Sequence, residues 1–150
     1  MNSKDKGNIG EAVALAEFTK YGIQCAIPFG DNARYDLIAE FNGKLNKIQV
    51  KFCNSKTECD SYTCRLVSSK NHTTNKVLSN YTEDVDYMVF YIKELNVCLL
   101  VPIDKCKNQT IITFRNKETL NNQTKRTHLI KDYTFDKILC VETLHGQPKS

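Results

Sequence analysis

Three polar residues on two neighbouring strand-like segments could together act on a phosphate group. Asp36 lies on the first segment, and Gln49 and Lys51 lie on the second. The segments are joined by Asn42-Gly43, and Asn-Gly between two strand-like runs is the strongest short-range signal of a β-hairpin. The sequence therefore predicts that a carboxylate, an amide and an ammonium group come together on one hairpin.

The hairpin fixes a register that can be worked out residue by residue. A two-residue turn pairs Phe41 with Lys44, so counting outward places Asp36 opposite Gln49. Directly opposed residues have Cβ atoms about 4.5–5.5 Å apart, and the diagonal neighbour Lys51 would lie about 7–8 Å away. Strand alternation turns the next residues to the other face. These are Ile48, Val50 and Phe52.

The grouping has two interpretations. Oxygen ligands suit Mg²⁺, which keeps several waters. A metal beside a phosphate polarises it, and a lysine can offset the charge that develops there. The other interpretation is an ordinary polar hairpin face on which Asp36 attracts Lys51. Spacing alone leaves both open.

Residues 9–21 are predicted to form a helix that could bring a second carboxylate to this place. Its apolar stripe consists of Ile9, Ala12, Val13 and Ala16, widened by Leu15. Ser3 or Asn8 could cap its start, and Gly22 stands where a helix ends. Glu11 lies at the edge of the stripe, so it would join Asp36 if the helix packs on the polar face of the hairpin.

The rest of the chain reads as further strands within one mixed α/β domain, 1–150, with a single central sheet. A second hairpin is expected around 94–96, a short helix is expected from Asp132, and 68–80 and 116–131 read as polar loops. The predicted strands are 24–28, 35–41, 44–53, 62–67, 87–92, 97–102 and 109–114.

Basic residues are concentrated in the second half of the chain. Residues 1–60 hold 8 Lys/Arg against 8 Asp/Glu, whereas residues 61–150 hold 13 against 9. Segment 105–131 alone has seven basic residues and one acid, and segment 65–76 has three basic residues and none. Such a distribution is typical of a face that binds a polyanion, although a solvated surface would look the same.

The seven cysteines indicate neither a disulfide framework nor a zinc site. Their number is odd, no Cys-x-x-Cys pair is present, and the gaps between Cys53, Cys59 and Cys64 are poor zinc spacing. We therefore expect free thiols. The N-terminus lacks an apolar signal segment and no apolar run approaches the roughly 20 residues of a membrane span, so a cytoplasmic protein without a membrane partner is expected.

Three short motifs in order resemble the core of PD-(D/E)XK nucleases. They are Gly7-Asn8-Ile9-Gly10-Glu11-Ala12, Tyr35-Asp36-Leu37-Ile38 and Ile48-Gln49-Val50-Lys51. Within that superfamily the layout resembles archaeal Holliday-junction resolvases and the small homing endonucleases of bacterial group I introns. The later run 85–91 and the strand that ends at Pro102 are similar to the intron type.

The resemblance implies a restriction-endonuclease-like fold, a central mixed sheet flanked by helices, and metal-dependent hydrolysis of DNA. The implied catalytic residues are Glu11, Asp36, Gln49 and Lys51. The implied ligands of Mg²⁺, or of Mn²⁺, are Asp36, Gln49, Val50 and Glu11. Gln49 departs from the pattern, since most members have Asp or Glu there, and an amide is the weaker ligand.

The leading hypothesis is a sequence-specific, intron-homing endonuclease that cuts double-stranded DNA and takes no small-molecule substrate. Cutting both strands calls for a homodimer or a higher even oligomer. A Holliday-junction resolvase and a catalytically inactive DNA-binding module are the alternatives. The expected DNA contacts, in the loops of the second half, are Arg65, Ser69, Lys70, Lys76, Arg115, Lys117, Lys125 and Arg126.

Overall fold

A five-stranded mixed sheet lies at the centre of the computed structural model, which describes residues 1–67, 84–117 and 127–145. β3 and β6 are parallel, and the other neighbours are antiparallel. In spatial order the strands are β1 (Gln24–Ala26), β2 (Leu37–Phe41), β3 (Lys44–Cys53), β6 (Tyr87–Ile92) and β7 (Val97–Pro102). The mixed α/β class predicted from the sequence is confirmed.

The β2–β3 hairpin has the predicted register. Phe41 pairs with Lys44 and Leu37 pairs with Ile48. Asn42 and Gly43 both have positive φ, 58° and 66°, as a two-residue turn that matches the twist of its strands requires. The second predicted hairpin is also present, because β6 and β7 are antiparallel and joined by a short 3-10 turn at Lys93–Leu95.

The first helix, α1 (Ser3–Lys20), starts earlier than predicted. Its cap is Asn2, whose side chain accepts a hydrogen bond of 2.9 Å from the backbone N–H of Asp5, so neither Ser3 nor Asn8 caps it. Its end is the predicted one. Gly22 has φ of 70°, and the backbone N–H groups after the helix bond back to its last carbonyls.

The buried stripe of α1 differs from the predicted one. Gly10, Ala14 and Phe18 are buried, whereas Ile9 is 37% exposed and Ala12 is also exposed. The helix packs closely on β3 through Gly10, where a Cβ would meet Val50 Cγ1 at 3.4 Å. A glycine counts for little in a hydrophobicity pattern, but it lets the two backbones approach, and this contact sets the face that the helix buries.

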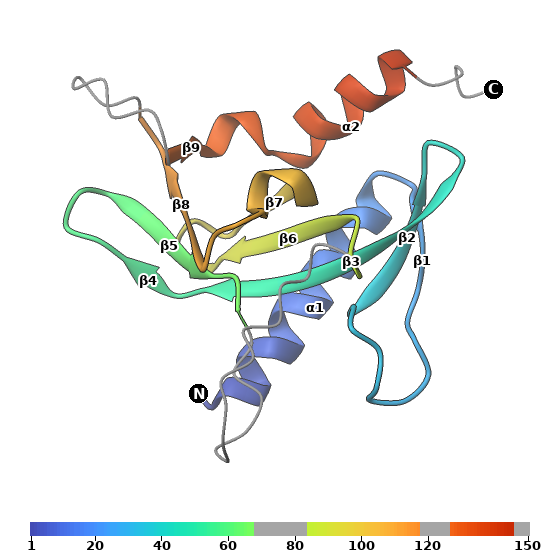
Figure 1. The fold of residues 1–150 in the computed structure, drawn as a ribbon, viewed down its shortest axis with the longest axis horizontal. Coiled ribbons are helices and arrows are strands. Elements are labelled where there is room, and N and C mark those ends of the chain that lie inside the picture. Colours follow the sequence, from blue (N-terminus) through green and yellow to red (C-terminus); the bar gives the residue numbers. More distant parts are fainter. Residues whose placement is uncertain (68–83, 118–126, 146–150) are drawn as a thin grey trace.

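A second, four-stranded sheet departs from the prediction of one central sheet. Its order is β4 (Ser55–Lys56), β5 (Ser61–Arg65), β8 (Ile111–Arg115) and β9 (Thr127–Leu129). β8 and β9 are parallel, and the other pairs are antiparallel. Figure 1 shows β3 running on into the β4–β5 hairpin. The predicted loop 116–131 thus contains β9 and the start of a 3-10 turn, Ile130–Asp132.

The two faces of the central sheet have different cover. On one face α1 and α2 (Phe135–His145) form a core in which Phe18 and Phe135 meet edge to face at 4.8 Å. On the other face the second sheet packs, with the rings of Phe90 and Phe114 5.2 Å apart. Figure 1 shows α1 crossing β3 and α2 lying next to β7. Helices therefore flank one face, and the second sheet takes the place of helices on the other.

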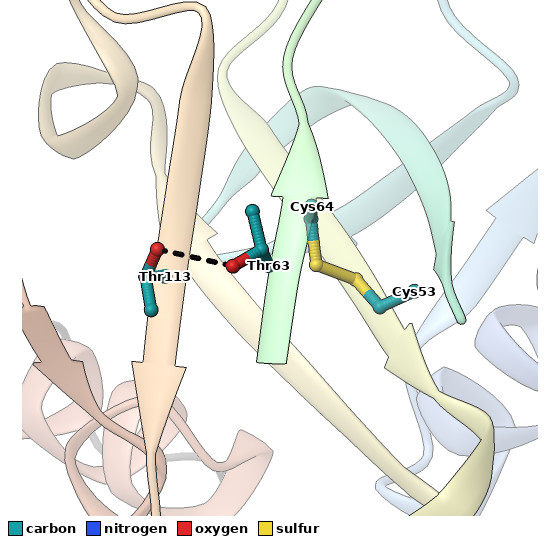
Figure 2. Close-up of a disulfide and its surroundings, with 4 residues drawn as sticks. All are labelled: Cys53, Thr63, Cys64 and Thr113. Carbon is teal, nitrogen blue, oxygen red and sulfur yellow. Dashed lines mark hydrogen bonds between the residues drawn. A yellow bond between two sulfur atoms is a disulfide. The ribbon is translucent and has the colours of Figure 1, made fainter. Parts of the chain in front are cut away.

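The expectation of free thiols is wrong for two cysteines. Cys53 at the end of β3 and Cys64 on β5 form a disulfide, with their Cα atoms 5.3 Å apart (Figure 2). The bond joins the central sheet to the second sheet within their shared core. Sequence spacing could not reveal it, because the two residues meet only once β5 has folded over β3. Cys25, Cys59, Cys98, Cys106 and Cys140 are free.

None of the helices in the described ranges is long and apolar enough to cross a membrane.

Candidate active site

Asp36 lies just before β2 and is held by β3 in the way the hairpin register predicts. Its Oδ2 accepts hydrogen bonds from Gln49 Nε2 at 2.5 Å and from the backbone N–H of Val50 at 2.6 Å. Its own N–H donates to the carbonyl oxygen of Ile48 at 2.8 Å. Asp36 is thus fixed by three hydrogen bonds with one strand, and the two bonds to its carboxylate fall on a single oxygen.

The environment of Asp36 favours the neutral acid. Burial raises the pKa of its carboxyl group, and this outweighs the Val50 N–H, the positive charge of Lys51 and the Gln49 amide, which all lower the pKa. A half-buried carboxylate of this kind gains when a further positive charge approaches it. The site is therefore suited to a cation.

Lys51 lies two residues beyond Gln49 on β3 and is half-buried. Strand alternation places both on the face that also carries Cys53, and Cys53 belongs to the core beneath the second sheet. Ile48 and Val50 lie on the opposite face, in the core with α1. The predicted division of β3 into a polar and an apolar face is thus confirmed near the hairpin.

Glu11 reaches the site from the other side. Packing of α1 on the face of Gln49, the condition under which Glu11 was expected to join Asp36, does not occur, since the helix covers the face of Val50 instead. Nevertheless, partial burial and then the negative charge of Asp36 raise the pKa of the Glu11 carboxyl group. The two acids are therefore close enough to repel each other.

Two residues that position the site belong to the motifs quoted from the sequence but were given no role there. Gly10 allows α1 to sit close to β3, which places the neighbouring Glu11. Asp86, directly before β6, accepts a hydrogen bond of 2.8 Å from the Lys47 backbone N–H and pairs with Lys44 Nζ at 3.3 Å. It thereby clamps β3 against β6. Its only sequence signal is an acid immediately before an apolar strand.

The donor set fits a magnesium ion only through mixed ligands. In the described ranges, no three His, Cys, Asp or Glu side chains gather where they could hold a metal. What comes together is the Asp36 carboxylate, the Gln49 amide, the backbone of Val50 and the Glu11 carboxylate. The two carboxylates repel each other, whereas Gln49 and Val50 turn N–H groups toward Asp36, so the amide oxygen of Gln49 becomes a ligand only if that group turns over. Carboxylate and amide oxygens suit a hard cation that retains water.

Of the eight predicted DNA contacts, three lie in the described residues. Arg65 ends β5 and is exposed, Arg115 ends β8 and is half-buried, and Lys117 follows it and is exposed. Arg65 and Arg115 belong to the second sheet and not to the β2–β3 hairpin that carries the candidate site. The others lie outside the described residues: Ser69, Lys70, Lys76, Lys125 and Arg126.

Comparison with known proteins identifies the family and the fold. The family model for PD-(D/E)XK endonucleases matches residues 1–136. The fold is similar to that of the bacterial homing endonuclease I-Ssp6803I, with a TM-score of 0.69 and 22% sequence identity, covering 97% of this chain and 94% of that one. No curated protein matches the sequence. PD-(D/E)XK nucleases generally use divalent metal ions. The chain therefore belongs to the PD-(D/E)XK endonuclease family and is an endonuclease that acts on DNA.

Proposed function

We propose that the protein is a Mg²⁺-dependent, sequence-specific endonuclease of the intron-homing type that cuts both strands of duplex DNA. The observation that carries the proposal is the group formed by Asp36, Gln49 and Lys51 on the hairpin. Glu11 lies close enough that the negative charge of Asp36 adds to burial in raising the pKa of the Glu11 carboxyl group. Mn²⁺ is expected to replace Mg²⁺, since both accept oxygen ligands.

The residues of the site have distinct roles in this proposal. Asp36, Gln49, Val50 and Glu11 would hold the cation, which supplies polarisation of the scissile phosphate and acidification of a water. Gln49 now donates its amide N–H to Asp36, so its amide group must turn over before its oxygen can serve as a ligand. Lys51 is positioned to stabilise negative charge that grows on the phosphate in the transition state.

Sequence specificity and the homing role are proposed on two grounds. The structural neighbour is by its title a bacterial homing endonuclease, and the alignment spans nearly all of both chains. In addition, Arg65, Arg115 and Lys117 provide positive charge outside the catalytic group. Because a duplex has two antiparallel strands, cutting both calls for two sites related by a dyad, so we propose a homodimer or a higher even oligomer.

The metal requirement is tested on a randomised duplex library and on supercoiled plasmid. We expect cutting with Mg²⁺ or Mn²⁺, and binding without cutting with Ca²⁺, since Ca²⁺ accepts oxygen ligands but holds them in looser geometry. Robust cutting in excess EDTA would overturn the metal mechanism.

The same assay separates the alternatives. A linear duplex cut at a defined sequence supports the homing endonuclease. Preferential cutting of a four-way junction would indicate a Holliday-junction resolvase instead. Binding with no cutting in any divalent metal would indicate an inactive DNA-binding module.

A further inference from the structure

The second sheet has one apolar face and one polar face. Tyr62 and Cys64 on β5, with Ile112 and Phe114 on β8, point into the core against the central sheet. Figure 2 shows the consequence on β5: Cys64 turns toward Cys53, while Thr63 turns the other way, toward Thr113 of β8. The two threonine hydroxyl groups lie 3.4 Å apart.

The outward positions of β5 and β8 form three cross-strand pairs. The register pairs Arg65 with Ile111, Thr63 with Thr113, and Ser61 with Arg115. Ser61 is only 3% exposed and Ile111 is an exposed apolar residue, so the accessible polar positions are Arg65, Thr63, Thr113 and the half-buried Arg115. None of these outward positions carries a carboxylate, and the two arginines stand at opposite ends of the ladder. Four residue steps along a strand span about 14 Å, which corresponds to roughly four base pairs of duplex.

Arg115 has a polar atom in need of a partner. Across the described residues, its Nε is the buried side-chain nitrogen or oxygen atom without a hydrogen bond. An arginine N–H that is withdrawn from water and unpaired is unfavourable, and guanidinium groups bind guanine edges and phosphates with paired hydrogen bonds. Because that atom is shielded from solvent, an acceptor brought by DNA would pair with it only if the half-buried side chain turned outward on binding.

The polar ribbon and the catalytic group lie on the same side of the central sheet. Gln49 and Lys51 share their face of β3 with Cys53, where the disulfide ties on β5. Lys51 is two residues from that tie, about 7 Å along the strand. Packed sheets are about 10 Å apart, and the major groove is about 8.5 Å deep and admits a two-stranded β-ribbon. β5 and β8 are the middle strands of the second sheet, with β4 and β9 beside them, so the pair would meet the groove with its outward face and bring the flanking backbone toward the level of the catalytic residues.

We propose that the outward face of β5 and β8 docks against the major groove, where Thr63, Thr113 and Arg115 read base edges over about two base pairs. This inference rests on the proposed function and adds to it the residues that determine specificity. Thr hydroxyl groups can donate to or accept from base edges, and their methyl groups can contact thymine. Arg65, exposed at the end of the ladder, serves as a phosphate contact.

The test selects bound sequences from a randomised duplex library in Ca²⁺, so that it reads recognition without cleavage. Three variants are compared with the wild type: Thr113→Val, Arg115→Lys and Arg65→Ala. The matched control is Thr19→Val, on the exposed side of α1 where the hydroxyl bonds only to the Leu15 carbonyl. Thermal unfolding of each variant establishes that it is folded. Arg65 is exposed, so Arg65→Ala should fold normally and give an interpretable binding measurement.

Thr113→Val and Arg115→Lys should each lower the preference for the favoured base by about tenfold to a hundredfold at one or two positions of the bound DNA. The preference at the other positions should not change. Arg65→Ala should weaken binding to all sequences alike and reduce the salt slope by about 1. Thr19→Val should keep the full profile. Folded Thr113→Val and Arg115→Lys variants with the wild-type profile would overturn the inference while leaving the proposed function intact. A wild-type protein without sequence preference would overturn both.

Discussion

The two sheets use polar residues in opposite ways. The central sheet is packed against other elements on both faces. Its polar residues Asp36, Gln49 and Lys51 are half-buried, and they lie just before a strand or where the packed elements leave a strand partly exposed. In β5 and β8 of the second sheet, polar residues alternate with apolar ones, and the outward face is polar apart from Ile111. A polar side chain in a sheet that is packed on both faces is costly to bury, so its presence indicates a chemical role. Polar side chains on an outward face are solvated and indicate at most a surface that a partner contacts. We assign catalysis to the first and recognition to the second.

The largest effect is expected from removing the ammonium group of the central sheet. Lys51→Ala should lower the cleavage rate by about 10²–10³-fold or more while DNA affinity changes little, because the charge acts mainly on the transition state. Single-turnover cleavage and equilibrium binding in Ca²⁺ measure the two quantities. Lys20→Ala, on α1 and paired with Glu17, is the control that should cut normally.

Asp36→Asn should also stop cleavage, through loss of the metal. If both Lys51→Ala and Asp36→Asn cut at the wild-type rate, the hairpin group is not the active site, and the division of labour between the sheets is wrong.

Gln49→Glu examines the unusual amide. If Gln49 serves as a ligand, a carboxylate at that position should bind Mg²⁺ more tightly and retain part of the activity, since it adds the charge that an amide lacks. A titration of cleavage rate against Mg²⁺ concentration should show a lower half-saturation point. An unchanged half-saturation point would place Gln49 outside the ligand set and leave it the task of holding Asp36.

The disulfide is where the two sheets depend on each other. Cys53→Ala or Cys64→Ala should each cost about 2–3 kcal/mol of unfolding free energy, the typical contribution of a bond that closes a short loop. The double variant should lose about as much as either single one, since both remove the same bond. Chemical denaturation measures all three, and the exposed free Cys59→Ala is the control. Additive losses would show that the thiols stabilise the core separately.

The strands of the central sheet were predicted from the sequence more accurately than those of the second sheet. β3, β6 and β7 were predicted to the residue, because Asn42-Gly43 defines one turn and long apolar runs define the others. β4 and β9 have two and three residues, too few to show any period. The second sheet was therefore not predicted as a sheet, although most of β5 and β8 was.

The site was better predicted than its surroundings. The pairing of Asp36 with Gln49 followed from local turn geometry, which needs no tertiary information. The face buried by α1 did not follow, because it depends on a glycine contact with Val50 that a hydrophobic pattern cannot register. The Cys53–Cys64 bond depends on the approach of two sheets, and cysteine spacing does not determine connectivity.

The smallest effect concerns pH and separates the acidic central site from the outward face of the second sheet, which carries no carboxylate on β5 or β8. Burial raises the pKa of Asp36 in the folded protein, so between the unfolded value of 3.8 and that raised value the folded state binds more protons than the unfolded state. Stability should therefore fall as pH rises through the folded pKa. Asp36→Asn removes this loss, and the variant should unfold at a slightly higher temperature than the wild type near neutral pH.

That advantage should shrink toward about pH 4, where Asp36 becomes neutral in the wild type as well. Glu11→Gln is the informative companion, since it removes the repulsion between the two acids and should give a smaller gain of the same sign. Mg²⁺ should raise the unfolding temperature of the wild type near neutral pH but not that of Asp36→Asn, because only the wild type offers the carboxylate. Thermal unfolding across pH, with and without Mg²⁺, measures every arm. Equal stabilisation of both proteins by Mg²⁺ would mean that the cation binds elsewhere, and that Asp36 on the central sheet does not hold the catalytic metal.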